Sequence, residues 1–350
     1  MKNTYFKRVY NLTGTKFWIN NVTPQEARMA IEAGAVGCTQ NPSYTWKILS
    51  HPEAGKDADA ILDKILKETG DDNEVECILQ RKLVKGISDI FMDVWNSTNG
   101  EHGYVSIQGD PIHEEDPEVI ISEGRKNREM NPNIMIKIPA TDAGLKAMEV
   151  LIAENTPVNA TEVMGISQAL DICRMYRKLS RETGKTPKIY YSLITGIYDE
   201  YLQKSVEKQR IEIDPDILYM AGLIIAKKVY SMTKALFPDV GFIGGGVRGL
   251  HHFTEMVGAD VCITMNWPGQ AEELLKQDFP VVPRFFNPAP EKYIDELLIR
   301  VPEFRQAYMT DGLEVEDYEH FGPVEYFRDM FISAWEKALI HIGQRRTIES

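Results

Sequence analysis

Eight short apolar segments alternate with helix-like segments along the chain, and this alternation restricts the fold more than any other feature. Each apolar segment is rich in β-branched or aromatic residues and is bounded by turn residues, which is typical of buried parallel strands. Eight β-α repeats over about 250 residues predict a (β/α)8 TIM barrel, with a doubly wound sheet as the alternative. The segments are KFWIN (16–20), VGCTQ (36–40), YVSIQG (104–109), IMIKIP (134–139), PVNAT (157–161), KIYYSLI (188–194), GFIGGG (241–246) and VCITM (261–265).

Helical patterns fill the intervals between these segments. In the first of them, Thr23 is a suitable N-cap and Gly34 a stop signal. Two regions lie outside the eight repeats, and both have helical patterns. One is an insertion at about 44–100, and the other is a C-terminal extension at about 281–350 with a long amphipathic pattern. We expect both to decorate a single barrel domain spanning residues 1–350.

The charge balance excludes several classes of partner. With 39 Lys and Arg against 52 Asp and Glu, the formal charge is −13, which repels nucleic acid and anionic membranes. No apolar run is long enough to span a bilayer, and the N-terminus lacks the apolar core of a signal peptide, so we expect a cytoplasmic protein. The four cysteines and seven histidines are scattered without metal-ligand spacing, so no metal or other cofactor is expected.

Lys137 lies where an ammonium group is least favoured, in the apolar run IMIKIP. A lysine on a strand buried on both faces must reach an end of the strand, pair with an acid or lose its proton. The neutral amine of such a lysine is a nucleophile toward ketones, and the resulting iminium acts as an electron sink. The segment therefore indicates imine chemistry without a bound cofactor.

The other strand-like segments end in amides, hydroxyls and carboxylates. Because active sites of such barrels lie at the carboxyl ends of the strands, these residues are the candidates for binding and proton transfer. Strand periodicity places Gln108 on the same face as Asp110, and Asn159 on the same face as Thr161. The full set is Asn20, Asn41, Ser43, Gln108, Asp110, Lys137, Asn159, Thr161 and Ser192.

Four segments, GCTQNPS, VSIQGDP, IMIKIPATDAGLKAM and VNATEVMGISQA, resemble motifs of the transaldolase family in order and spacing. The resemblance, which includes the fructose-6-phosphate aldolases, extends from Lys16 to about Leu275. It implies a class I aldolase-type barrel in carbohydrate metabolism, with Lys137 as the Schiff-base lysine and a sugar or sugar phosphate as substrate. It also implies that Asn41, Asn159 and Ser192 hold substrate hydroxyls and that Thr161 positions a catalytic water.

Both proton-transfer carboxylates of the family motifs are replaced by amides in this chain. Asn20 stands where transaldolases carry Asp, and Gln108 where they carry Glu. The tyrosine that accompanies a strand-three glutamine in fructose-6-phosphate aldolases is replaced by Ile194. Since an amide cannot titrate, we expect weak activity on fructose 6-phosphate and consider three stand-ins: Asp110, Tyr191 and Glu162. Asp110 has a competing interpretation as a loop or capping carboxylate before Pro111.

The phosphate-binding end of the motif is also partial. Ile197 replaces one family arginine, whereas Arg248 in GGGVRGL matches the second and is expected to bind an anion at the start of a helix. A substrate with less charge than a sugar phosphate is therefore considered as well. His251 and His252 are expected on the solvent side of that helix.

Three functions remain open at this stage. The leading one is an aldolase or transaldolase that makes or breaks a carbon–carbon bond through Lys137. The alternatives are a non-catalytic sugar-binding barrel and a phosphate-binding isomerase barrel. The donor and acceptor sugars, the choice between transfer and simple cleavage, and a homo-oligomeric state are left undecided.

Overall fold

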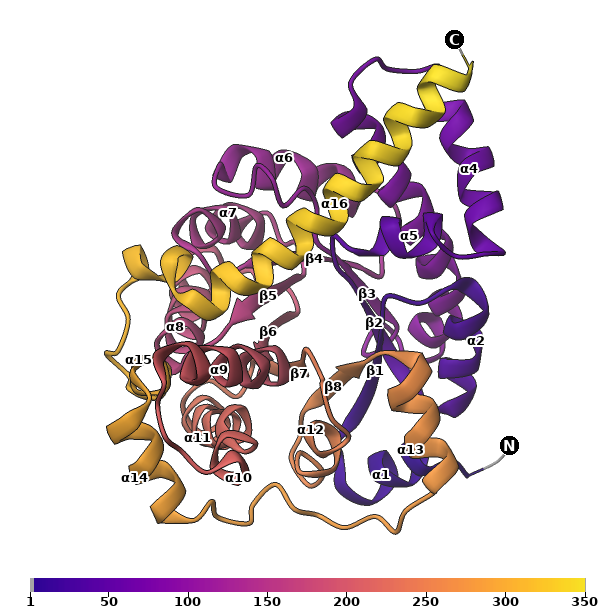
Figure 1. The fold of residues 1–350 in the computed structure, drawn as a ribbon. Helices are drawn as coiled ribbons and strands as arrows, with labels where there is room; N and C mark the ends of the chain where they lie inside the picture. Colours follow the sequence, from indigo (N-terminus) through magenta and orange to yellow (C-terminus); the bar gives the residue numbers. More distant parts are fainter. Residues whose placement is uncertain (1–2, 350) are drawn as a thin grey trace.

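The computed structural model describes residues 3–349 and shows eight parallel strands closed into a barrel (Figure 1). The strands follow one another around the barrel in sequence order, and β1 pairs with β8 to close it. The prediction of a (β/α)8 barrel is confirmed, and the doubly wound alternative is wrong, because an open sheet would leave two unpaired edges. The strands are β1 (Lys16–Asn20), β2 (Ala35–Gln40), β3 (Tyr104–Ile107), β4 (Ile134–Pro139), β5 (Val158–Val163), β6 (Ile189–Ile194), β7 (Gly241–Gly245) and β8 (Cys262–Met265).

The helices that follow the strands form the outer layer, and their ends agree with the capping signals in the sequence. Thr23 accepts a hydrogen bond from Glu26 N at the start of α2, and Gly34 ends that helix at a φ of 115°. Helix α1 precedes the barrel. Apart from the helices of the insertion, the helices before β8 are α1 (Tyr5–Thr13), α2 (Pro24–Ala33), α6 (Pro117–Arg128), α7 (Asp142–Ala153), α8 (Ile166–Thr183), α9 (Thr195–Gln209), α10 (Pro215–Leu218), α11 (Ala221–Leu236) and α12 (His251–Thr254).

The inside of the barrel is apolar in one layer and polar in the next. Six buried side chains from different strands form a separate apolar cluster: Trp18, Tyr104, Met135, Tyr190, Ile243 and Cys262. Because side chains alternate along a strand, the residue two positions further along each strand lies on the same inner face, nearer the carboxyl end. On β1, β4 and β6 that residue is Asn20, Lys137 and Ser192, respectively. The apolar layer closes the barrel below these polar groups.

The extra regions are helical, as the sequence indicates. The insertion after β2 forms α3 (Tyr44–Leu49), α4 (Ala54–Ile65) and α5 (Asp72–Ser97). The C-terminal part forms η1 (Trp267–Ala271), α13 (Glu272–Gln277), α14 (Glu291–Arg300), α15 (Pro302–Tyr308), η2 (Val315–His320) and α16 (Gly322–Glu349). None of the described helices is both long and apolar enough to cross a membrane.

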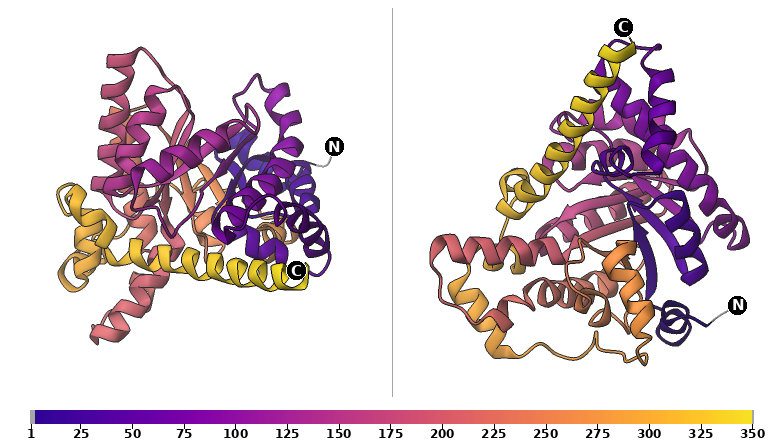
Figure 2. Two further views of the ribbon diagram at one scale, coloured as in Figure 1. Left: turned by 90° about the horizontal axis from the view of Figure 1, so that it is seen from above. Right: turned by 45° about the vertical axis from the view of Figure 1, so that its right-hand side comes forward.

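Helix α16 lies across one end of the barrel, from the side of α9 to the insertion helices (Figures 1 and 2). Its buried positions recur every three or four residues, which gives it one apolar face: Val324, Phe327, Phe331, Trp335, Ala338 and Ile342. Near its end, Arg345 pairs with Asp63 of α4 at 2.8 Å. Trp335 Nε1 donates to Asn73 Oδ1 of α5 at 2.8 Å. The helix therefore forms a roof that is joined to the insertion.

Candidate active site

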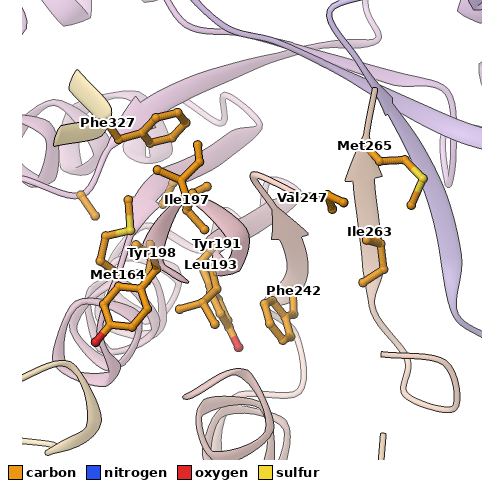
Figure 3. Packing of buried hydrophobic residues seen from close by; sticks show 14 of the residues in the cluster. Met164, Tyr191, Leu193, Ile197, Tyr198, Phe242, Val247, Ile263, Met265 and Phe327 are labelled. Atoms are coloured by element: carbon orange, nitrogen blue, oxygen red, sulfur yellow. The ribbon is translucent and has the colours of Figure 1, made fainter. Parts of the chain in front are cut away.

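A cavity of about 400 Å³ lies between the carboxyl ends of the strands and the roof helix α16. Its walls include seven of the residues singled out in the sequence: Asn20, Asn41, Ser43, Lys137, Thr161, Ser192 and Arg248. Phe327, Met330 and Phe331 of α16 also line it. Figure 3 shows Phe327 close to Ile197, where the roof meets the start of α9. The cavity is large enough for a sugar-sized ligand.

Lys137 extends from β4 into this cavity and is only 6% exposed. Its Nζ atom lies 5.5 Å from the centre of the Phe331 ring. Burial lowers the pKa of Lys137 to about 8, although nearby Glu162 and Glu114 act in the opposite direction. Near neutral pH a useful fraction of the side chain is therefore the neutral, nucleophilic amine.

The turn after Lys137 explains much of the local sequence. Thr141 caps α7 by accepting a hydrogen bond from Gly144 N at 3.1 Å. A Cβ atom at Gly144 would lie 1.8 Å from the carbonyl oxygen of Pro139, so only glycine lets the helix begin this close to the strand. The segment KIPATDAG thus holds the end of β4 in place.

Hydrogen bonds among amides and hydroxyls fix the floor around the amine. Ser192 Oγ donates to Asn159 Oδ1 at 2.7 Å, and Asn159 Nδ2 donates to Ser106 Oγ at 3.3 Å. Asn159 is fully buried and lies outside the cavity lining, so it holds Ser192. Asn20 accepts from Thr39 Oγ1 at 2.8 Å and donates to Asn266 Oδ1 at 3.0 Å.

Asn41 is held by its own neighbours at the rim of the cavity. Its Oδ1 atom accepts hydrogen bonds from Asn21 Nδ2 at 2.7 Å and Ser43 N at 3.0 Å. These bonds hold the Asn41 side chain at the cavity lining.

A β-bulge in β5 turns Glu162 toward the region of Lys137. The pairing of β5 with β6 changes register between Ala160 and Val163, and Glu162 has a φ of 59°. A non-glycine residue with this conformation carries backbone strain, which proteins retain mainly at functional sites. Glu162 is fully buried, and the hydroxyl of Thr161 before it has no hydrogen-bond partner among residues 3–349.

A second buried glutamate, Glu114, lies near Glu162. Gln108 Nε2 is 2.8 Å from Glu162 Oε1 and 3.5 Å from Glu114 Oε2, so one amide bridges both carboxyl groups. Burial raises the pKa of Glu114 well above its usual range, and the charge of Glu162 adds to this. Burial also raises the pKa of Glu162, against the Gln108 hydrogen bond and the charge of Lys137. Glu114, which the sequence analysis missed, lies in the loop between β3 and α6.

All three proposed stand-ins lie outside the cavity lining. Strand β3 ends at Ile107, so strand alternation does not relate Asp110 to Gln108, although both residues line a small space that Lys137 also lines. Asp110 instead accepts hydrogen bonds from Asn73 Nδ2 and Ile112 N, both at 2.7 Å, as a loop carboxylate does. The Tyr191 hydroxyl lies 2.8 Å from Thr233 Oγ1 of α11, and its ring stacks on Phe242, away from the cavity (Figure 3).

Arg248 lines the cavity and is paired there with Glu200 of α9. The expected helix after it is a single turn, α12, so a helix dipole contributes little to this end. Lys47, which the sequence analysis missed, also lines the cavity and lies 3.6 Å from Glu26. With Lys47 present, the loss of an arginine at Ile197 leaves two basic residues at the cavity besides Lys137.

The expectation that His252 faces solvent is wrong. It is 2% exposed, and its Nε2 atom lies 2.9 Å from Asp199 Oδ2. The neighbouring His251 is half-buried against the ring of Tyr219. Asp199, His251 and His252 offer three potential metal-ligand atoms within 4.8 Å of one another, an arrangement that sequence spacing did not indicate.

The closed barrel, the cavity at the carboxyl ends of its strands and the buried lysine together define an α/β-barrel of the enzyme type. The chain belongs to the transaldolase/fructose-6-phosphate aldolase family, whose model matches residues 17–299. The resemblance noted in the sequence is thereby confirmed at the level of the family.

Individual relatives are distant. A transaldolase of Mycobacterium tuberculosis (strain H37Rv) is 24% identical over 244 residues, which are 65% of this chain and 64% of the relative. A transaldolase of Mycobacterium ulcerans is 28% identical over 171 residues, 47% of this chain and 45% of the relative. The chain thus spans less than two thirds of the length of the curated relatives it matches.

Proposed function

We propose that this protein is a transaldolase-like class I aldolase that makes or breaks a carbon–carbon bond in a ketose or ketose phosphate. The amine of Lys137 attacks the ketone, and loss of water gives an iminium that stabilises the carbanion formed when the bond breaks. The observation that carries the proposal is the burial of Lys137 in a cavity at the carboxyl ends of the strands, with its pKa lowered to about 8.

The cavity supports a polyhydroxylated substrate with an anionic end. Asn20, Asn41 and Ser192 offer hydrogen-bond groups on the side of Lys137. Besides Lys137, the basic residues in its lining are Lys47 and Arg248, which suit a phosphate or another anion. Family membership supports a sugar phosphate as the substrate class.

Borohydride reduction in the presence of a panel of ketoses and ketose phosphates tests the proposal directly. Because imine formation releases water and reduction adds two hydrogens, the peptide that contains Lys137 should gain the mass of the substrate less one oxygen atom. Lys137→Met should abolish labelling and turnover, and so should Lys137→Arg, because guanidinium remains protonated and is a poor nucleophile. Labelling of another lysine, or normal turnover by Lys137→Met, would disprove the proposal.

The same experiment separates the alternatives. A non-catalytic sugar-binding barrel would bind ketoses in calorimetry without labelling. An isomerase would convert its substrate without a trapped adduct.

A further inference from the structure

Lys137 must exchange protons during the proposed reaction, and the amides at Asn20 and Gln108 cannot supply them. Before attack, the ammonium form must lose a proton. After attack, the carbinolamine hydroxyl must gain one to leave as water. A group that titrates near neutral pH is therefore needed close to this amine.

Two buried carboxyl groups, Glu114 and Glu162, lie within reach of that role. One oxygen of each is near Gln108 Nε2, and the other oxygen of each is buried without a hydrogen-bond partner in the described part of the chain. Two carboxylates this close cannot both ionise easily in a dry environment, so the pair retains one proton over a wide pH range.

A small space connects Glu114 of this pair to the amine. It has a volume of about 20 Å³, and Lys137, Gln108, Asp110 and Glu114 are among its lining residues. A space of this size holds one water molecule. Glu162 is also the strongest charged partner of Lys137, ahead of Glu114.

We propose that Glu114 and Glu162 form a proton-holding pair for the reaction at Lys137, an inference that rests on the Schiff-base function proposed above. Glu162 takes one proton from the ammonium form of Lys137, which leaves a neutral amine and a neutral carboxyl group. The amine then forms the carbon–nitrogen bond as the carbonyl π bond opens, and a proton moves from the nitrogen to the oxygen to give the carbinolamine. The carboxyl group returns its proton to the carbinolamine hydroxyl, the carbon–oxygen bond breaks, and water, an iminium and a carboxylate result. Charge and protons balance over the cycle.

The charged groups around the pair are compatible with this cycle. Lys137 and Arg328 of α16 favour the ionised forms, whereas Glu319 of η2 favours the neutral form of Glu114. Arg328 Nη1 is itself 3.2 Å from Glu319 Oε1, which limits its effect on the pair. The bulge at Glu162 is the local distortion that this placement requires.

The first test measures the rate at which borohydride traps dihydroxyacetone, or fructose 6-phosphate, on Lys137 between about pH 5 and 9. Glu162→Gln should slow trapping near pH 7 by about 10²–10⁴-fold. Glu114→Gln should shift the acidic limb of the profile to lower pH, because it removes the group that disfavours ionisation of Glu162. Glu76→Gln is the matched control: Glu76 is also a fully buried glutamate, but the charged groups that act on Lys137 are Glu162 and Glu114, so this variant should match the parent.

The second test needs no catalysis. Competitive acetylation followed by mass spectrometry gives the pKa of Lys137 in each variant. Glu162→Gln should lower it below 8, since a carboxylate that favours the ammonium form is lost, whereas Glu76→Gln should leave it unchanged. This readout also shows whether each variant retains the folded environment of Lys137.

The outcomes separate the two proposals. If all variants label Lys137 at the same rate and with the same pH profile, and the Lys137 pKa is unchanged, the proton-holding pair is overturned. The Schiff-base proposal is unaffected by that result. Absence of labelling on Lys137 in the parent protein overturns the Schiff base, and the pair with it.

Discussion

Arg248 donates its Nε hydrogen to the carboxylate of Glu200. The same carboxylate accepts hydrogen bonds from Tyr326 of α16 and Lys204 of α9. Burial by itself opposes ionisation, but the hydrogen bonds from Tyr326 and Arg248 lower the pKa of Glu200 to about 2. Arg248, the cation expected to bind an anionic substrate, is therefore connected through Glu200 to both α9 and the roof helix α16.

We expect Arg248→Ala to raise KM for a phosphorylated ketose about ten- to a hundredfold, the effect of losing roughly 1.5–3 kcal/mol of charge-assisted binding. The unphosphorylated parent sugar should be much less affected. Glu200→Gln keeps the cation and removes its competitor, so it should lower KM for the phosphorylated sugar. Steady-state kinetics with both sugars decides the point; equal losses for the two sugars would make Arg248 structural.

The rate of imine formation should rise with pH and level off above about 8. The neutral amine of Lys137 is the reactive form, and burial lowers its pKa to about 8, so the fraction of neutral amine grows until that pH is passed. Initial rates of borohydride trapping over the pH series give this profile. A rise that continues to pH 10 would mean that the lysine has an ordinary pKa and is more solvated than the structure indicates.

Glu76→Gln should stabilise the protein at pH 8 more than at pH 5. Burial raises the pKa of Glu76 to about 8 in the folded state, while the unfolded chain has an ordinary value near 4.3. Between these pH values the folded state holds a proton that the unfolded state has lost, so the free energy of unfolding falls as pH rises. Glu76→Gln removes this pH-dependent fall in the free energy of unfolding, which amounts to roughly 1.4 kcal/mol for each unit by which folding raises the pKa.

Urea denaturation of both proteins at the two pH values measures this difference. A stability difference that does not change with pH would contradict the raised pKa. Glu74→Gln, at an exposed position on the same helix, is the control for the change of residue type.

Phe331→Ala should destabilise the protein and raise the pKa of Lys137. Phe331 is 1% exposed, and loss of a buried phenylalanine side chain typically costs about 3–5 kcal/mol. Its ring lies 5.5 Å from Lys137 Nζ, so its removal admits water and favours the ammonium form. Ile340→Ala, at an exposed position on the same helix and outside the cavity lining, should do neither. Denaturation curves and competitive acetylation measure the two effects, and an unchanged Lys137 pKa would argue against shielding by the roof.

Gln108→Glu should lower both stability and activity, although it restores the residue of the family motif. Gln108 donates to Glu162 and lies near Glu114, so a glutamate here would place a third carboxyl group in the same buried space. The same change in a Glu162→Gln background should be tolerated better. The effect of Gln108→Glu on the activity with fructose 6-phosphate and on the melting temperature should be measured in the parent protein and in the Glu162→Gln background. A gain of activity from Gln108→Glu alone would contradict this arrangement of the site.

Much of the fold and the central lysine could be predicted from the sequence, because both depend on local signals. Period-two alternation, caps such as Thr23 and stops such as Gly34 act within a few residues, and eight repeats leave little choice of topology. Lys137 stood out because an ammonium group in an apolar strand is costly. The strand-end residues Asn20, Thr161 and Ser192 followed from the same periodicity.

The groups that surround the lysine were decided only by the tertiary structure. Strand periodicity alone would turn Glu162 away from the face of Thr161, but a bulge changes the register there. Glu114 comes from a loop and Phe331 from a helix almost 200 residues further along the chain than Lys137, and no short-range pattern relates either to β4. Loop conformation and the docking of α16 depend on contacts between distant segments. Periodicity and capping describe only neighbours along the chain, so they determine the barrel but not the environment that sets the charge of its lysine.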